Sequence, residues 1–361
     1  MIELFKLLPK PCNTHVHFSG FVNYNTILND IINNSILFDK IYINKKNYNL
    51  SFYKENTHDS YKNISLQDIE HLQYMIKDKK KYLDFSIFGQ IFYGIIRNFY
   101  YFCNFYLPNI IKKMKKHNIY FMEIRTKLNS CIDDNGNVIP ILTELEELYK
   151  YKKYFMIIVQ SSKCKKDSCK YFEKIIKLTL GTKFFEFIRG YDLVGDENKC
   201  INLKFFYNNL KELKEKYNIN YYMHAGEVIN GKNSDVNIEY AIKLKCIRIG
   251  HGIYAFNHVQ LLNDIIKNNI CLEICPLSNK ILYNYNVIES NINNNSSIVT
   301  IGSDDDNKFR TNLSSDFLYL YNSGINIDLI KILLLNSSKF NPYFDIHKFN
   351  DDYDNFMKLF K

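Results

Sequence analysis

Eight short apolar runs, separated by helical segments, constrain the fold of this chain more than any other feature of its sequence. Continuous runs of Val, Ile and Leu are typical of parallel strands that are buried on both faces. Such strands are expected at residues 12–18, 119–126, 154–160, 187–194, 220–224, 246–249, 270–275 and 297–303. Eight strand–helix units in one series favour an α/β fold closed as a (β/α)8 TIM barrel over an open, doubly wound sheet. No Gly-x-Gly-x-x-Gly motif follows the first strand, which agrees with this choice.

The segment between the first and second strands is long enough to carry extra helices. Apolar residues recur at helical spacing over residues 23–38, and a longer helical tract covers residues 68–116, with interruptions expected near Asp84 and at Pro108. Residues 40–63 are polar, aromatic and rich in Asn, and no structure is assigned to them. Since no linker or repeat is found, residues 1–361 are predicted to form a single barrel domain.

Charge and cysteine usage restrict the partners and the compartment of the chain. The formal net charge of +9 comes from dispersed lysines, with short clusters at residues 112–116 and 163–170, and indicates solvated helix faces and no nucleic-acid partner. No apolar run reaches the ~18 residues of a membrane span, and the N-terminus lacks a signal-peptide core. The nine cysteines are an odd number without paired spacing, so free thiols and a cytoplasmic location are expected. Cys164 and Cys169 lack a second pair that would complete a metal clip.

Side chains that bind metals stand at the ends of four predicted strands. His15 and His17 lie at i and i+2, on the same face of the first strand, while His224, His251 and Asp304 end the fifth, sixth and eighth strands. The carboxyl ends of barrel strands meet on one face, so these residues are expected to converge. Histidine rings with a carboxylate and a water suit zinc better than Mg²⁺ or Ca²⁺, which prefer oxygen ligands.

Glu227 follows His224 by three residues and adds a carboxylate that can exchange a proton beside this group. Each motif alone has a structural explanation, because a strand-terminal His is commonly hydrogen-bonded and an acidic run such as residues 304–306 suits a solvated loop. Their joint placement on successive strand ends has no such explanation. A bound zinc lowers the pKa of its water toward neutrality, so the pattern indicates hydrolytic chemistry.

Seven segments of the sequence carry a resemblance to a known family. They are residues 8–17 (LPKPCNTHVH), 120–125 (YFMEIR), 190–197 (GYDLVGDE), 223–227 (MHAGE), 248–252 (RIGHG), 273–279 (EICPLSN) and 302–305 (GSDD). They run in family order and cover most of the chain, which resembles the adenosine deaminases of the amidohydrolase superfamily. The second and third segments are most similar to the growth-factor-related branch, although the chain shows neither that branch's signal peptide nor its N-terminal extension.

The resemblance implies a zinc-dependent hydrolytic deaminase that converts adenosine or deoxyadenosine to inosine or deoxyinosine and ammonia. By motif, one zinc per chain would be held by His15, His17, His224 and Asp304. Glu227, kept protonated, would donate to purine N1, while His251 and Asp304 would orient and deprotonate the attacking water. The fourth strand has no lysine near its end, which disfavours the members that bridge two metals with a carbamylated lysine.

The resemblance also assigns contacts to a purine nucleoside substrate. Asp305 would hold purine N7, and the backbone N–H of Gly195 would meet N3. Ser19 stands where adenosine-specific members carry an Asp against the ribose 5′ hydroxyl, and Ser86 lies near a position where the growth-factor-related branch has a ribose-contacting acid. Asp306 replaces the Pro of most members and leaves both preceding carboxylates in place.

These departures keep two alternatives open. The first is a deaminase of a 5′-modified or phosphorylated adenosine, or of adenine. The second, from another class, is a purine-binding or growth-factor-like protein without catalysis. An intact ligand set together with Glu227 argues against the second, since a binding protein has no need of a proton donor. The sequence makes no prediction of the oligomeric state.

Overall fold

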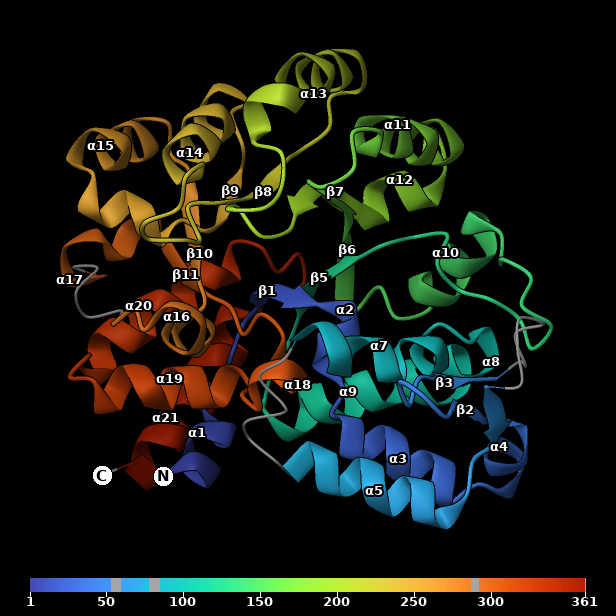
Figure 1. Cartoon of the computed structure of the whole chain (residues 1–361). Coiled ribbons are helices and arrows are strands. Elements are labelled where there is room, and N and C mark those ends of the chain that lie inside the picture. Colours follow the sequence, from blue (N-terminus) through green and yellow to red (C-terminus); the bar gives the residue numbers. More distant parts are fainter. Residues whose placement is uncertain (53–59, 78–84, 287–291, 361) are drawn as a thin grey trace.

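Eight parallel strands form the centre of the computed structural model, which describes residues 1–52, 60–77, 85–286 and 292–360 (Figure 1). The strands are β1 (Asn13–His17), β5 (Met122–Thr126), β6 (Phe155–Ser162), β7 (Ile188–Val194), β8 (Tyr222–Ala225), β9 (Arg248–His251), β10 (Cys271–Ile274) and β11 (Val299–Ile301). They pair in sequence order as two four-stranded sheets, β1-β5-β6-β7 and β8-β9-β10-β11. Isolated parallel bridges join the sheet edges, Val16 with Asp304 and Tyr191 with Tyr221. The predicted (β/α)8 barrel and its eight strands are therefore confirmed.

Helices follow these strands in the chain and pack around them. They are α10 (Ile141–Tyr149), α11 (Ser168–Thr179), α12 (Lys183–Phe187), α13 (Leu203–Tyr217), α14 (Ser234–Lys243), α15 (Val259–Lys267), α16 (Pro276–Tyr283), α17 (Ile292–Asn295), α18 (Asp306–Phe309), α19 (Leu313–Asn322) and α20 (Ile327–Ser338), with 3-10 turns η2 (Ile253–Asn257) and η4 (Ser296–Ile298). Helix α13 shows the pattern, because it buries Leu203, Phe206, Leu210 and Leu213 along one face. The terminal helices α1 (Ile2–Leu7) and α21 (Ile346–Phe360) meet through the edge contact of Phe5 with Phe356. No helix in the described part of the chain is long and apolar enough to cross a bilayer.

The insertion between β1 and β5 contains the extra helices that the sequence predicts. They are α2 (Phe18–Phe21), α3 (Tyr24–Ile32), α4 (Ser35–Lys40), α5 (Leu66–Lys77), α7 (Phe85–Ile96), α8 (Phe99–Tyr101), η1 (Phe102–Tyr106) and α9 (Leu107–Lys116). The helix expected over residues 23–38 is divided, because the Asn34 side chain accepts the N–H of Leu37 at 3.2 Å and starts α4. The unassigned residues 40–63 contribute an antiparallel sheet in the order β3-β2-β4, built from β2 (Tyr42–Asn44), β3 (Leu50–Ser51) and β4 (Tyr61–Asn63).

The helix break predicted at Pro108 is wrong. Pro108 lies in the first turn of α9, which continues the π-helical turn η1, where the N–H of Leu107 donates to the carbonyl of Phe102. The wider π turn changes the hydrogen-bond pattern ahead of the proline, so the missing N–H does not end the helix. The break lies instead at Asn98, whose side chain accepts the N–H of Tyr101 at 3.0 Å. The interruption expected near Asp84 falls outside the described residues.

The prediction that all cysteines are free thiols is wrong for one pair. Cys164 and Cys200 form a disulfide with a Cα–Cα distance of 4.5 Å, and the other seven cysteines are free. Cys164 follows β6 and Cys200 follows β7, and these two strands are paired in parallel. Parallel pairing brings the loops at the two carboxyl ends together. The two cysteines are 36 residues apart in the sequence, so their spacing alone does not predict the disulfide.

Candidate functional site

Four histidines from three strands converge at the carboxyl ends of the barrel strands. His15 and His17 come from β1, His224 from β8 and His251 from β9. The ring centroid of His15 lies 4.7 Å from that of His224 and 4.8 Å from that of His251, and the rings of His17 and His224 are 5.2 Å apart. His15, His224 and His251 are buried and His17 is partly buried. The predicted convergence of these rings is thus confirmed.

Buried carboxylates determine which nitrogen of two rings carries the proton. Nδ1 of His15 lies 2.7 Å from Oε2 of Glu273, and Nδ1 of His224 lies 2.7 Å from Oδ2 of Asp192. A carboxylate accepts, so each Nδ1 donates and each Nε2 keeps its lone pair. Burial lowers the pKa of His224 to about 3, against the opposing charge of Asp192, and burial likewise holds the pKa of His15 well below its usual range. Both rings are therefore neutral ligand-type imidazoles.

The Nε2 atoms of the three rings face one another together with a carboxylate. Nδ1 of His17 meets Oε1 of Gln160 at 2.8 Å, which leaves its Nε2 directed at Nε2 of His224 at 3.3 Å. Nε2 of His15 is buried and has no hydrogen-bond partner among the described residues. Oδ1 of Asp304 lies 3.5 Å from Nε2 of His17 and 4.0 Å from Nε2 of His15.

This donor set fits a metal ion. Lone pairs aimed at each other across 3.3 Å, with a buried nitrogen that lacks a partner, are unfavourable unless a cation lies among them. Ligand atoms of His15, His17 and His224 all lie within 4.8 Å of one another. Histidine metal ligands usually donate a hydrogen bond from the opposite ring nitrogen to such an acceptor, which fixes the orientation of the ring. The histidines and Asp304 together match the chemistry of a four-coordinate zinc site.

Glu227 and His251 lie beside this set with Asp304. The three residues offer ligand-type atoms within 4.8 Å of one another, and Nε2 of His251 is 3.6 Å from Oε1 of Glu227. Oδ1 of Asn279 accepts the N–H of Cys275 at 3.3 Å, so the Asn279 amide nitrogen faces Nδ1 of His251 at 3.0 Å. In a neutral His251 ring the proton is then on Nε2. Burial raises the pKa of Glu227, and nearby Asp304 adds to that effect against the opposing charge of His251.

Two of these residues adopt an uncommon backbone conformation. His251 has a φ of 63° and Asp304 a φ of 58°, both in the left-handed region. Residues other than Gly occupy this region at a cost of about 1–3 kcal/mol, and such residues cluster at functional sites. The Oγ of Ser278 donates to Oδ2 of Asp304 at 2.6 Å, which leaves Oδ1 directed at the histidines.

The three residues predicted to contact substrate follow β1, β7 and β11 in the chain, with Ser19 in the short helix α2. Ser19 lines a cavity of about 120 Å³ that also reaches Gln160, the partner of His17. Gly195 has a φ of 127°, and a Cβ there would lie 2.9 Å from Sγ of Cys200, so only Gly fits. Asp305 pairs with Lys308 and keeps Oδ1 buried without a hydrogen-bond partner in the described chain. Ser86 belongs to α7, but its side chain is outside the described part of the structure.

A buried ion network beneath the histidines was missed in the sequence. Nε of Arg125 donates to Oδ2 of Asp192 at 2.7 Å and Nε of Arg248 donates to Oε1 of Glu273 at 2.5 Å, while Arg125 also pairs with Glu273 and Arg248 with Glu123. Burial opposes ionisation of Asp192, but His224 and Arg125 hold its pKa below the usual range. Charged residues inside predicted strands that are buried on both faces were the available signal, because such charges require partners.

Glu197 was also missed and holds the loop that carries Glu227. Its Oε1 accepts the N–H of Gly226 at 2.9 Å, and its Oε2 accepts the N–H of Glu227 at 2.9 Å and of Val228 at 3.2 Å. The Asn237 side chain donates to Oε1 at 2.7 Å. Glu197 is 1% exposed, so solvent cannot replace these bonds. This carboxylate fixes the backbone position of Glu227.

We expect Glu197→Gln to lower both the free energy of unfolding and turnover. The NH₂ group of glutamine is a donor and cannot accept a hydrogen bond from the backbone N–H groups that Glu197 binds. At least one of these buried N–H groups then loses its partner, at a cost of about 1–3 kcal/mol. Denaturant unfolding at fixed metal content measures the loss. Glu212→Gln on the exposed face of α13 is the matched control, with an expected change below about 0.5 kcal/mol. Equal stability of the two variants would contradict the positioning role of Glu197.

Comparison with known proteins adds a family and a fold to this geometry. Residues 67–324 match the family model described as adenosine deaminase. Adenosine deaminase 2 of Dictyostelium discoideum is 31% identical over 267 residues, which cover 68% of this chain and 49% of that protein. The chain thus spans about half the length of this curated relative.

Solved structures of low sequence identity share the fold. The N6-methyl-AMP deaminase of Arabidopsis thaliana in its apo form aligns with a TM-score of 0.67 at 17% identity, over 99% of this chain and 98% of that one. An amidohydrolase from Burkholderia ambifaria with bound zinc aligns with a TM-score of 0.66 at 13% identity, over 99% of this chain and 94% of that one. At these identities the alignments establish the barrel architecture only.

Proposed function

This chain belongs to the adenosine deaminase family, and we propose that it hydrolytically removes the C6 amino group of adenosine or deoxyadenosine, with inosine or deoxyinosine and ammonia as products. One observation carries the proposal: three histidine Nε2 lone pairs and Asp304 converge beside Glu227, whose pKa is raised by burial. A protonatable carboxylic acid next to a metal site suits hydrolysis of a purine amidine. We further propose that residues 1–361 act as one catalytic domain.

We propose one zinc per chain, held by His15, His17, His224 and Asp304. The nitrogen-rich donor set supports zinc, and the zinc bound by the Burkholderia ambifaria amidohydrolase is consistent with this choice. When bound, zinc supplies an activated water at neutral pH.

The protein groups around that water would transfer the protons. In the proposed reaction the water oxygen bonds to C6 and Glu227 donates its proton to N1. The proton taken from the water then passes to N6, the remaining hydroxyl proton returns to Glu227 as the C6 carbonyl forms, and the C6–N6 bond breaks to release ammonia. His251 and Asp304 lie on the same side as Glu227, where His251 would orient the water through its Nε2–H and Asp304 would take up the water proton. The Nε2–H of His251 points toward Glu227 at 3.6 Å, which keeps the ring directed at the reacting atoms. Burial of these groups strengthens each interaction because water does not screen it.

Purine recognition requires hydrogen-bond donors for two ring nitrogens, N3 and N7, which are acceptors. The backbone N–H of Gly195 would donate to N3, as the family motif implies. Asp305 pairs with Lys308, so this acidic and basic pair would supply the donor to N7. The Oδ1 of Asp305 is buried and has no hydrogen-bond partner in the described chain, which supports a role of Asp305 in substrate contact.

The cavity around Ser19 favours a 5′-phosphorylated adenosine as a second candidate substrate. Arg97 and Lys127 line the same cavity of about 120 Å³, together with Glu144, whose pKa burial raises to about 7. No carboxylate lies within ion-pair distance of Lys127 among the described residues, and burial lowers its pKa, with the charges of Lys165 and Arg97 adding to the effect. Two cations beside a neutral Ser19 would attract a phosphate where an Asp would repel it.

An ultraviolet assay for loss of the C6 amino group tests the proposal. The zinc-loaded protein is assayed with adenine, adenosine, deoxyadenosine, methylthioadenosine and AMP at equal concentration. Turnover of at least one nucleoside or nucleotide is expected, and the ranking selects the sugar or 5′ group. If the zinc-loaded protein binds these compounds and turns over none of them, the deaminase proposal fails in favour of a purine-binding protein.

We expect Ser19→Asp to raise kcat/KM for adenosine and lower it for AMP. A charge-assisted hydrogen bond to the 5′ hydroxyl is worth ~1.5 to 3 kcal/mol, or roughly ten- to a hundredfold, and the same carboxylate repels a phosphate. Both substrates are measured on both proteins, with Ser35→Asp on exposed α4 as the control for added charge. An unchanged ratio of the two kcat/KM values would mean that Ser19 does not face the sugar.

A further inference from the structure

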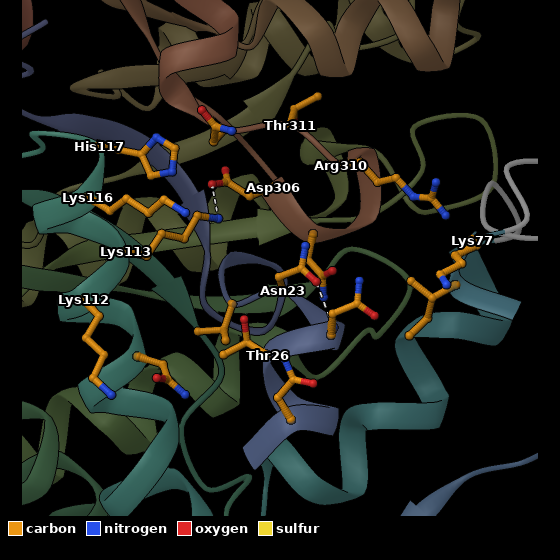
Figure 2. Close-up of a pocket in the computed structure, with 17 residues that line it drawn as sticks. Asn23, Thr26, Lys77, Lys112, Lys113, Lys116, His117, Asp306, Arg310 and Thr311 are labelled. Carbon is orange, nitrogen blue, oxygen red and sulfur yellow. Dashed lines mark hydrogen bonds and ion pairs between the residues drawn. The ribbon is translucent and has the colours of Figure 1, made fainter. Parts of the chain in front are cut away.

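A basic cavity of about 610 Å³ lies outside the histidine cluster, among helices α3, α5, α9 and α18 (Figure 2). Figure 2 shows Lys112, Lys113 and Lys116 of α9 along one side, with Arg310 across the cavity. Lys77, at the end of α5, borders the cavity as well. Its volume is within the range of about 300–1,000 Å³ that is usual for small-molecule sites.

Positive charge dominates this cavity. Among the residues that the structure describes, five side-chain cations line it, from Lys77, Lys112, Lys113, Lys116 and Arg310, against one carboxylate, that of Asp306. Lys113 pairs with Asp306 at 2.6 Å, so the carboxylate of Asp306 already has a cation and does not offset the charges of Lys77, Lys112 and Lys116. Within the described residues no carboxylate lies within ion-pair distance of Lys112 or Lys116. His117 adds no charge, since burial lowers its pKa to about 3.

Solvation of one helix face does not account for this arrangement. Lys112, Lys113 and Lys116 share α9, but Lys77 and Arg310 come from segments far away in the sequence and border the same cavity. Clustered like charges repel and destabilise the folded state unless an anion lies among them. Neutral hydrogen-bonding side chains, including Thr26 and Asn29 of α3, complete the wall.

We propose that this cavity binds a small polyanion that carries two or more phosphate groups, such as a nucleoside diphosphate or triphosphate. Lysine ammonium groups bind phosphate oxygens as point charges, and Lys77, Lys112 and Lys116 place three of them around one cavity, which suits a ligand with several phosphate groups. The cations surround a hollow and do not form an extended stripe, which favours a small ligand over nucleic acid or a membrane surface. The cavity is separate from the deaminase proposal, but its wall includes Asp306, next to Asp305 in the chain.

The test is isothermal titration calorimetry of the metal-loaded full chain at one fixed, low ionic strength. Inorganic triphosphate and CTP are the two probes, because their comparison separates the contribution of phosphate from that of a nucleoside. The double variant Lys112→Glu with Lys116→Glu reverses two of the cations. Lys170→Glu with Lys174→Glu makes the same change, at the same spacing of four residues, on the exposed face of α11. Circular dichroism establishes that each variant is folded, and Lys112→Gln with Lys116→Gln provides a milder change.

We expect saturable binding of both probes to the wild-type chain. The Lys112 and Lys116 reversal is expected to weaken binding by about tenfold or more, the glutamine pair by less, and the control pair by less than about twofold. Equal weakening in the control would mean nonspecific attraction to a chain of net charge +9, and would overturn the proposal. Absence of binding to the wild type, or binding by the wild type only of duplex DNA or anionic vesicles, would overturn it as well. Binding that persists undiminished in the reversed variant would overturn it too, because the probe would then bind at another site, the metal included.

Discussion

We expect Glu227→Gln to lower turnover by about 10²-fold or more while zinc content stays near that of the wild type. Glutamine preserves the size and most of the hydrogen bonding of Glu227, but it has no proton to transfer to N1, and general acid catalysis typically contributes 10²–10⁴-fold. The backbone N–H of residue 227 still donates to Glu197, so the loop keeps its position. Steady-state kinetics and elemental analysis of the same preparation measure the two quantities.

The pH dependence of the wild type should reflect the same carboxyl group. Burial and nearby Asp304 raise the pKa of Glu227, so its acid form persists to higher pH than that of an ordinary Glu and is lost as the pH rises through the raised value. The alkaline loss of kcat/KM that this causes should be absent from Glu227→Gln. Glu239→Gln on exposed α14 is the matched control and should leave turnover unchanged. Normal turnover by Glu227→Gln would make Glu227 a structural residue.

The barrel and the histidine cluster could be predicted because both depend on position along the strands. Continuous apolar runs identified the strands, and parallel strands in a barrel must bring their carboxyl ends to one face. His15, His17, His224, His251 and Asp304 therefore converge as expected. The pattern of apolar residues thus predicts the fold, and the fold predicts which strand-end residues form the site.

Features that depend on contacts between distant segments could not be predicted in this way. Glu273 and Asp192 orient two of the histidines, yet in the sequence they are single charges within apolar strands. Glu197 lies 30 residues before the N–H of Glu227 that it accepts. The cluster of residues 112–116 was interpreted as a solvated face, since only the folded insertion brings Arg310 across from it.

Metal removal should abolish turnover, and zinc should restore it. The Nε2 atoms of His17 and His224 approach to 3.3 Å, and Nε2 of His15 is buried without a hydrogen-bond partner in the described chain, so these nitrogens remain unsatisfied when the ion leaves. Prolonged chelation should therefore also lower the Tm, because a ligand at 1,000 times its Kd stabilises the folded state by about 4 kcal/mol. Elemental analysis should find one zinc per chain before chelation and after reconstitution.

Two histidine variants, one at the site and one as a control, distinguish this zinc from adventitious metal. His224→Ala removes one converging Nε2 and leaves Asp192 without its imidazole partner, so we expect zinc content and turnover to fall together, with the Tm reduced even in excess zinc. His347→Ala removes an exposed histidine on α21 and should retain the zinc, the turnover and the Tm of the wild type. Turnover that survives chelation, or equal zinc in both variants, would remove the metal from the proposed mechanism. In that case the orientation of three Nε2 lone pairs toward one point would require another buried cation or a proton shared between His17 and His224.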